Sequence, residues 1–203
     1  MKIGAGSRRL LPRRPACPIQ TGMTRAAKPR LSRDAWLDAG LAALRQAGPA
    51  ALGAEPLARR IGATKGSFYW HFRDVPEFQA ALLGAWEATE LRAMQDSLPA
   101  DTHAAHQLRV FAQRLATRHD TGEAALRAWA AIHPPAAITI ARIDAARRDL
   151  LAGLLAEIGI TNPEIARLLQ AAATGMAALG DDEAGRNADA IGSLADLILA
   201  LRE

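Results

Sequence analysis

The fold is decided by residues 62–74, which run Gly62-Ala63-Thr64-Lys65-Gly66-Ser67-Phe68-Tyr69-Trp70-His71-Phe72-Arg73-Asp74. Thr64 is a good helix N-cap, because its hydroxyl can accept a hydrogen bond from an N–H group of the first turn. Phe68 and Phe72 are four residues apart and therefore share one helix face. Two large apolar rings on one side of so short a helix predict that this side docks against the rest of the chain.

The other sides of this segment carry polar groups and stackable rings. Gly66 removes side-chain bulk at a point where another backbone can come close. Such a set is typical of a face that contacts nucleic acid, whereas a helix face that meets only solvent carries mainly Glu and Lys. The residues that we expect to contact DNA are Thr64, Lys65, Gly66, Ser67, Tyr69, Trp70 and His71, together with Arg59 from the segment before them.

A second short helix is predicted just before this segment, where Leu57 and Ile61 share a face at a spacing of four residues. Gly62 follows as the residue expected to end that helix in the left-handed conformation. Further upstream, Ser32 is the expected N-cap of a longer helix that ends at Gly48. A helix, a glycine turn and a second helix with an exposed polar face form a helix-turn-helix unit, and the upstream helix would complete its core.

Residues 31–87 resemble the DNA-binding domain of the TetR family of bacterial transcriptional regulators. The resemblance lies in Gly62, Thr64-Lys65-Gly66-Ser67, Phe68-Tyr69-Trp70-His71-Phe72 and Arg73-Asp74. Gly53 stands where the family usually has a capping Thr or Ser, and Pro56 lies in the first turn of that helix, where proline is tolerated. Val75 replaces a commonly basic residue and so removes one expected phosphate contact. The resemblance implies an all-α, TetR-like protein: a three-helix DNA-binding domain followed by a helical ligand-binding and dimerisation domain.

The charge distribution suits such an arrangement. Residues 1–30 have a formal charge of +8, residues 31–75 of +2 and residues 76–203 of −6. Positive charge is thus concentrated where phosphate groups would be neutralised, and the acidic remainder is a poor candidate for DNA contact. We therefore expect a basic, disordered tail at 1–30, a helix-turn-helix domain at 31–75 and a helical ligand-binding and dimerisation domain at 76–203. The tail is either an arm that adds affinity for DNA or a segment upstream of a true start at Met23.

The C-terminal half is predicted to be helical, beginning with a long helix that Asp74 caps. Further helices are expected near 101–118, 121–133, 135–158, 162–180 and 187–202. The last two carry apolar stripes at helical spacing. In TetR-like proteins the last two helices of each subunit form a four-helix bundle between subunits, so we expect a homodimer through 162–180 and 187–202. The alternative is that both stripes serve only the core of one chain.

The middle helices are where a TetR-like protein binds its inducer, a small molecule. The candidates for the pocket wall are Trp86, Met94, Phe111, Trp129, His133 and Met176. Large apolar residues on helices usually belong to a core, so ordinary packing is the competing interpretation for each of them. Two tryptophans and one histidine suit a small, mostly apolar ligand.

Other kinds of site find little support in the sequence. Cys17 is the only cysteine, which excludes an intrachain disulfide framework or a cysteine-rich zinc site. His103 and His106 have no acidic or cysteine partner at a fixed spacing, so no metal site is predicted. No Ser/His/Asp arrangement or carboxylate pair stands out, so neither catalysis nor a cofactor is predicted. No apolar run approaches the roughly 20 residues that span a bilayer, and we expect a cytoplasmic protein.

The sequence therefore predicts a homodimeric, sequence-specific DNA-binding transcriptional regulator, most simply a repressor that a small molecule releases from double-stranded operator DNA. Two other classes stay open: an architectural nucleic-acid-binding protein without a sensing pocket, and a helical enzyme that uses the C-terminal pocket. By the resemblance, ligand binding would shift the long helix that begins near Val75 and change the separation of the two DNA-binding domains.

Overall fold

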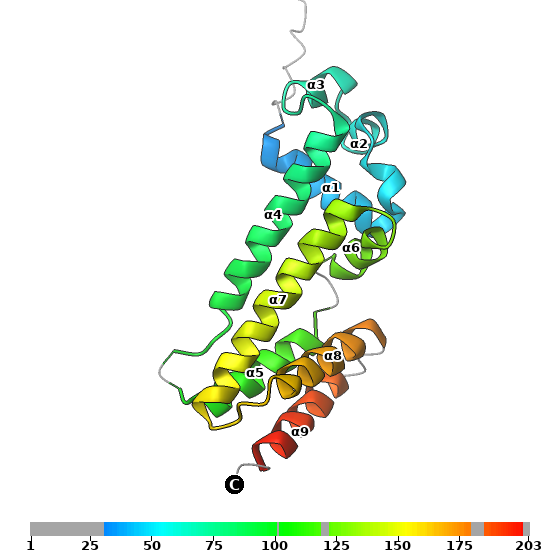
Figure 1. The fold of residues 1–203 in the computed structure, drawn as a ribbon. Helices are drawn as coiled ribbons and strands as arrows, with labels where there is room; N and C mark the ends of the chain where they lie inside the picture. The colour runs from blue at the N-terminus through cyan, green and yellow to red at the C-terminus, as the bar shows by residue number, and fades with distance from the viewer. Residues whose placement is uncertain (1–30, 101, 119–121, 180–184, 201–203) are drawn as a thin grey trace, which may run out of the picture. The chain divides into compact units, whose positions relative to one another are not determined.

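The computed structural model describes residues 31–100, 102–118, 122–179 and 185–200, which contain helices and no strand. The helices are α1 (Arg33–Ala47), η1 (Pro49–Leu52, a 3-10 helix), α2 (Ala54–Arg60), α3 (Lys65–Tyr69), α4 (Val75–Gln95), α5 (Ala104–Ala116), α6 (Glu123–Ala130), α7 (Pro134–Glu157), α8 (Pro163–Leu179) and α9 (Arg186–Ala200), shown in Figure 1. The all-α fold is therefore confirmed. The expectations for the tail at 1–30 lie outside the described residues.

Helix α1 begins and ends where the sequence predicts. The Ser32 hydroxyl accepts a hydrogen bond from Ala35 N at 3.1 Å, and Gly48 ends the last turn with a φ of 73°. The inner face of α1 needs a glycine, because a Cβ on Gly40 would lie only 2.6 Å from Cζ of Phe78. This close approach brings α1 directly against α4.

Helix α2 has no side-chain hydrogen bond at its N-terminus, because its N-cap residue is Gly53. Pro56 is accommodated in its first turn, as expected. Gly62 follows with a φ of 63°, so the chain turns sharply into α3 in the conformation that favours glycine. At the far side of α3, the Asp74 carboxylate caps α4 by accepting from Glu77 N at 2.8 Å. That hydrogen bond and the neighbouring Arg73 lower the pKa of Asp74. The predicted turn and cap are thus both present.

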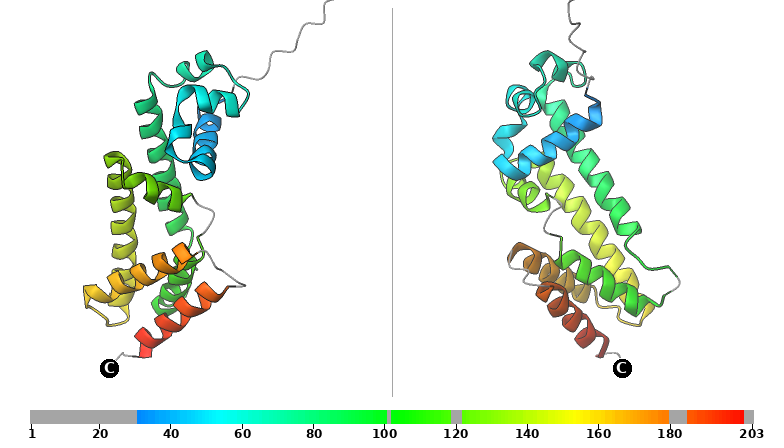
Figure 2. Two further views of the ribbon diagram at one scale, coloured as in Figure 1. Left: turned by 90° about the vertical axis from the view of Figure 1, so that its right-hand side faces the viewer. Right: turned by 180° about the vertical axis from the view of Figure 1, so that it is seen from behind.

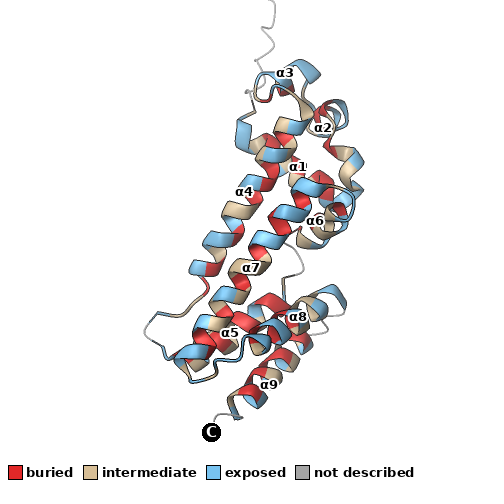
Figure 3. Cartoon of the chain, in the orientation of Figure 1, coloured by how far each residue is buried: buried red, intermediate tan, exposed pale blue. Residues whose placement is uncertain are grey.

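A first core lies beneath the helix-turn-helix and is dominated by aromatic rings. The Phe68 ring has centroid distances of 5.5 Å to Trp36, 5.3 Å to Phe72 and 5.3 Å to Phe78. The Phe72 and Phe78 rings meet edge to face at 5.0 Å. All four side chains are buried, and Figure 3 shows further buried positions along the helices at this end of the chain. Edge-to-face contacts of this kind are favourable beyond the burial of the rings themselves.

The first core does not end at residue 75. It continues through Leu82 of α4, Leu126 of α6 and Ile143 of α7, which are all buried. A second core joins α5 to the end of α7 and to α8 and α9, around Leu108 and Leu169. In both views of Figure 2, α5 lies beside α8 and α9. The helix-turn-helix is therefore packed onto the next region of the chain rather than joined to it only by the backbone.

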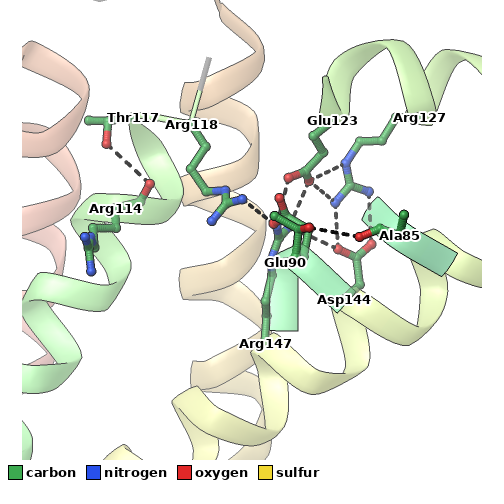
Figure 4. A network of polar contacts seen from close by, with 10 residues as sticks. Ala85, Glu90, Arg114, Thr117, Arg118, Glu123, Arg127, Asp144 and Arg147 are labelled. Carbon is green, nitrogen blue, oxygen red and sulfur yellow. Dashed lines mark hydrogen bonds and ion pairs between the residues drawn. The ribbon is translucent and has the colours of Figure 1, made fainter. Parts of the chain in front are cut away.

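An alternating chain of charged side chains crosses the junction between the two cores (Figure 4). Arg147 of α7 is buried and donates to Glu90 of α4 at 3.0 Å and to both carboxylate oxygens of Glu123 at 2.8 Å. Arg127 donates to Glu123 at 2.7 Å and to Asp144 at 2.6 Å. Each acid in this series of ion pairs, called the ion chain below, has an arginine partner. Buried charges are tolerated only when they are paired in this way.

Glu123, at the first position of α6, is central to this ion chain. Burial alone would raise the pKa of its carboxyl group, but the hydrogen bonds and charge of Arg147, with those of Arg127, lower that pKa to about 2. Burial likewise works against the charged form of Arg147, and its pairing with Glu123 and Glu90 outweighs this and raises the pKa. The pair is therefore charged at neutral pH and ties α6 to α7.

Replacing Glu123 by Gln should lower the free energy of unfolding at pH 7 by about 3–5 kcal/mol, because Arg147 loses its bidentate partner while it stays buried. The folded-state pKa is depressed from 4.5 to about 2, so the contribution of Glu123 is complete above pH 4.5 and is lost as the pH falls toward 2. Urea unfolding at pH 7 and pH 3 should therefore show less acid destabilisation in Glu123→Gln than in the wild type.

Glu87→Gln is the matched control, since it removes a more exposed pair between α4 and α7, that of Glu87 with Arg142. This variant should lose much less stability at pH 7 and keep the acid sensitivity of the wild type. If Glu123→Gln and the wild type lost the same stability on acidification, the electrostatic role of Glu123 would be contradicted.

Candidate DNA-binding surface and ligand cavity

Helix α3 is too short to be stable alone, so its orientation depends on how it is capped and docked. The Thr64 hydroxyl accepts from Ser67 N at 3.1 Å, which confirms the predicted N-cap. Phe68 is fully buried among the rings of the first core. The N–H groups of His71 and Phe72 donate to the Phe68 carbonyl, and this last turn carries the Phe72 ring into the same core. Cap and rings together fix which side of α3 faces outward.

The outer side of α3 has the composition of a contact surface. Its exposed residues are Thr64, Lys65, Gly66, Tyr69 and Trp70, and Ser67 and His71 are half-buried. Trp70 is 79% exposed and Tyr69 is 46% exposed. Large rings at this level of exposure on a docked helix are most simply explained by a partner that covers them.

Three nearby residues complete the surface. A Cβ on Gly66 would come no closer than 3.8 Å to a neighbouring atom, so packing within the described chain does not require glycine there. Arg59 of α2 is exposed and pairs with Glu55 at 2.9 Å, so a phosphate group would compete with that carboxylate. Arg73, which the sequence analysis did not select, has an exposed side chain just after Phe72. Arg73 directly follows the aromatic segment 68–72, and this position in the sequence could have marked it as a candidate contact residue.

A family model matches this part of the chain. Residues 37–74, which hold the end of α1, α2, α3 and the cap of α4, match the model for bacterial regulatory proteins of the tetR family. The match gives the DNA-binding region of this chain a TetR-type sequence. The function class that this match supports is that of a DNA-binding transcriptional regulator.

Solved structures share the fold of most of this chain. A TetR-like transcriptional regulator from Rhodococcus sp. RHA1 is 22% identical, with a TM-score of 0.69 over 86% of this chain and 99% of that chain. A TetR transcription regulator from Haloarcula marismortui ATCC 43049 is 16% identical, with a TM-score of 0.65 over 84% of this chain and 97% of that chain. SmeT, the repressor of the Stenotrophomonas maltophilia multidrug efflux pump SmeDEF, is 21% identical, with a TM-score of 0.61 over 84% of this chain and 90% of that chain. At these identities the likeness shows the fold. No curated protein matches the sequence.

A cavity of about 610 Å³ lies between α1, α4 and α5. Of the residues predicted to line a pocket, Trp86 and Phe111 are in its wall. The full lining is Leu37, Asp38, Leu41, Leu82, Ala85, Trp86, Thr89, Glu90, Ala93, Ser97, Phe111, Arg114, Leu115, Thr117 and Arg118. The α1 residues in this set lie within residues 37–74, so one wall of the cavity comes from the region that matches the family model.

The other four predicted pocket residues do not line this cavity. Met94 is buried in the second core, and Met176 packs against that core. Trp129 is buried in the first core and stacks on His133 with ring centroids 4.3 Å apart. His133 Nδ1 accepts a hydrogen bond from Ala136 N at 3.3 Å at the start of α7. Core packing and helix capping account for these positions.

The polar side of the cavity was not predicted. Glu90 is four residues after Trp86, which is four residues after Leu82, so a carboxylate occupies the buried stripe of α4. It accepts a hydrogen bond from Arg118, which follows α5 and also lines the cavity. A charged residue inside an apolar helical stripe is the sequence signal that marks this side.

The remaining candidate positions give no second site. His103 and His106 lie at the start of α5 with ring centroids 6.2 Å apart, and no group of three or more metal-ligating side chains gathers among the described residues. Within the same ranges, no helix has both the length and the apolar character needed to cross a membrane.

The two sides of α3 should respond differently to truncation. Phe68→Ala should lower the free energy of unfolding by about 3–5 kcal/mol, because it empties the centre of the first core. Trp70→Ala should leave that free energy within about 0.5 kcal/mol of the wild type, because the ring is exposed. Chemical denaturation of both variants measures the difference. A large loss in Trp70→Ala would show that the ring is part of the core and not of a contact surface.

Proposed function

We propose that this protein is a ligand-responsive, sequence-specific repressor that acts as a homodimer and is released from its operator by a small molecule. The observation that carries the proposal is the outer side of α3. It combines a cation, hydroxyl groups and two exposed rings on a helix that its inner rings hold in place. Such a helix can enter the major groove of DNA, where base edges present donors, acceptors and the thymine methyl group.

The proposed contacts divide into those that specify sequence and those that position the domain. Lys65 suits the acceptors of guanine, and Tyr69 or Trp70 suits a thymine methyl group. The Ser67 hydroxyl would also contact a base edge. Other groups would contact phosphates without reading sequence: the Thr64 hydroxyl, His71 and Arg59. Gly66 leaves space for the close approach of the DNA backbone.

Lys65→Ala should weaken operator binding by about 1–3 kcal/mol and relax specificity at the base it contacts. Gel shifts with the DNA that flanks the gene of this protein, and with random DNA of equal length, measure both effects. Arg92→Ala, which removes an exposed cation near the other end of α4, is the matched control and should bind as the wild type does. Equal weakening of Lys65→Ala on both DNAs would contradict a role in reading bases.

Dimerisation is supported by apolar side chains that the described chain leaves uncovered on α8 and α9. Leu168 and Leu179 of α8 are 62% and 71% exposed, and Leu197 of α9 is 66% exposed. Glycine inside a helix is unfavourable by about 1 kcal/mol relative to alanine, yet Gly175 lies on α8, where a Cβ would meet nothing within 4 Å. The close approach of a second α8 explains both features, and a two-fold operator requires two reading helices.

Gly175→Leu should therefore convert the dimer to a monomer, because the new side chain would lie between the two α8 helices. Sedimentation at micromolar concentration measures the mass. Gly153→Leu is the matched control: Gly153 is also an exposed glycine within a long helix, α7, and its Cβ position is equally open. That variant should sediment as the wild type does. A monomeric wild-type chain would overturn the proposed dimer.

Ligand response is supported by the cavity, which favours a sensor over a purely architectural DNA-binding protein. Its wall contains Leu37 and Leu41 of α1 and Trp86 of α4, and α1 and α4 are the helices whose rings hold α3. A molecule in the cavity changes operator affinity only if it binds more tightly to the arrangement that fits the operator less well. A protein that acts in this way on operator DNA would be located in the cytoplasm.

A further inference from the structure

We propose that the small molecule bound in the cavity between α1, α4 and α5 is uncharged and mainly apolar. This inference rests on the proposed ligand response and adds the chemical class of the ligand. It follows from the matched charges of the cavity wall, from the hydrogen bonds that its hydroxyl groups already make and from the apolar surface that remains.

The wall of the cavity carries no net charge. Among the described residues it contains two acids, Asp38 and Glu90, and two arginines, Arg114 and Arg118. Such a wall attracts neither anions nor cations as a class. An ion that left water to enter the cavity would lose its hydration, and no surplus of the opposite charge would offset that loss.

The charges on the buried side of the cavity are paired with each other. Arg118 is 17% exposed and donates a hydrogen bond to Glu90, and Arg147 donates to the same carboxylate at 3.0 Å. An anion would have to compete with Glu90 for Arg118, and a cation would have to compete with two arginines for Glu90. Breaking a buried pair is strongly unfavourable, so these charges favour a ligand that leaves them as they are.

The other two charged residues of the wall do not select an ion of either sign. Asp38 of α1 and Arg114 of α5 are both exposed, and solvent weakens the field of an exposed charge. They also have opposite signs, so one of them repels any ion that the other attracts.

The hydroxyl groups of the wall are already hydrogen-bonded within the chain. Those of Thr89, Ser97 and Thr117 each donate to a backbone carbonyl three or four residues earlier, at 2.9, 2.6 and 3.2 Å respectively. A hydroxyl group has one proton to donate. None of the three therefore has a proton left for the oxygen atoms of a ligand oxyanion.

The rest of the wall is apolar and comes from three helices. Leu37 and Leu41 contribute from α1, Trp86 from α4 and Phe111 from α5. A volume of about 610 Å³ accommodates a ligand of two or three rings. Transfer of the apolar surface of such a ligand out of water is favourable without any charge on it. The wall thus suits a neutral ring compound or hydrocarbon.

The test uses three naphthalene compounds of similar size that differ in charge. They are 1-naphthalenemethanol, which is neutral, 1-naphthoate, an anion, and 1-naphthylmethylammonium, a cation. Each competes at pH 7 with the neutral fluorescent dye N-phenyl-1-naphthylamine for the full-length protein. The dye should bind, and the alcohol should displace it at concentrations about tenfold lower than either ion, because each ion loses its hydration without gaining a partner.

The place of binding is checked with a matched pair of variants. Thr89→Phe narrows the cavity from an exposed position and should weaken the binding of the dye and of the alcohol severalfold. Ala141→Phe adds a ring at an exposed position of α7 outside the cavity wall and should bind both as the wild type does. Unchanged binding in Thr89→Phe would overturn the assignment of the ligand to this cavity.

The charge balance is checked by removing one exposed charge at a time. Asp38→Asn should lower the concentration of 1-naphthoate needed for displacement by about two- to fivefold and raise that of the cation, and Arg114→Gln should do the reverse. Asp149→Asn, which removes an exposed acid of α7 outside the wall, should leave both unchanged. Displacement by either ion at concentrations as low as those of the alcohol in the wild type overturns the uncharged class. A wild type that does not bind the dye overturns it as well.

Operator release separates this inference from the function on which it rests. The alcohol should lower operator affinity in the wild type and do so less in Thr89→Phe. If all three compounds bind equally and release the operator, the ligand response stands and the uncharged class is overturned. If the alcohol binds in the cavity but leaves operator affinity unchanged, the ligand response fails and the class of molecule that the cavity binds stands.

Discussion

The structure depends on the docking of Phe68. Helix α3 is five residues long, and a helix of that length gains too few backbone hydrogen bonds to offset the entropy of forming it. Its position is set instead by the contacts of Phe68 with Trp36 on α1 and with Phe78 on α4. Every residue that we propose to contact DNA from α3 points outward because this ring points inward. The aromatic contacts therefore affect function by fixing the orientation of α3 against α1 and α4.

The two helices that hold α3, α1 and α4, also line the cavity. The first core runs from the helix-turn-helix into α6 and α7, and the same α1 that holds Phe68 supplies Leu37 and Leu41 to the cavity wall. The proposed ligand would therefore contact both α1 and α4 directly. The buried ion chain adds a polar constraint at the same junction. Arg147 holds Glu90 and Glu123 together, and a partly broken set of buried charges is far less stable than a complete one.

Local features of this structure could be predicted because each depends on a few neighbouring residues. The caps at Ser32, Thr64 and Asp74 and the turn at Gly62 require only a side-chain oxygen or a missing Cβ at the right spacing. The cavity was harder to predict, because a large apolar residue has the same periodicity whether it faces a neighbour or an empty space. Trp86 and Phe111 line the cavity and the other four candidates do not, and nothing in the spacing of these residues distinguishes them.

The sequence by itself determined the helical class, the boundaries of most helices and the inward side of α3, since helix propensity, capping and apolar periodicity are properties of short segments. The tertiary structure decided which helices enclose the cavity and which charges meet there. Glu90, Arg118 and Arg147 come from α4, from the segment after α5 and from α7, and only folding brings them within hydrogen-bond distance. The physical reason is range: a cap or a stripe is formed by atoms a few residues apart, whereas a cavity and an ion chain exist only after distant helices have packed.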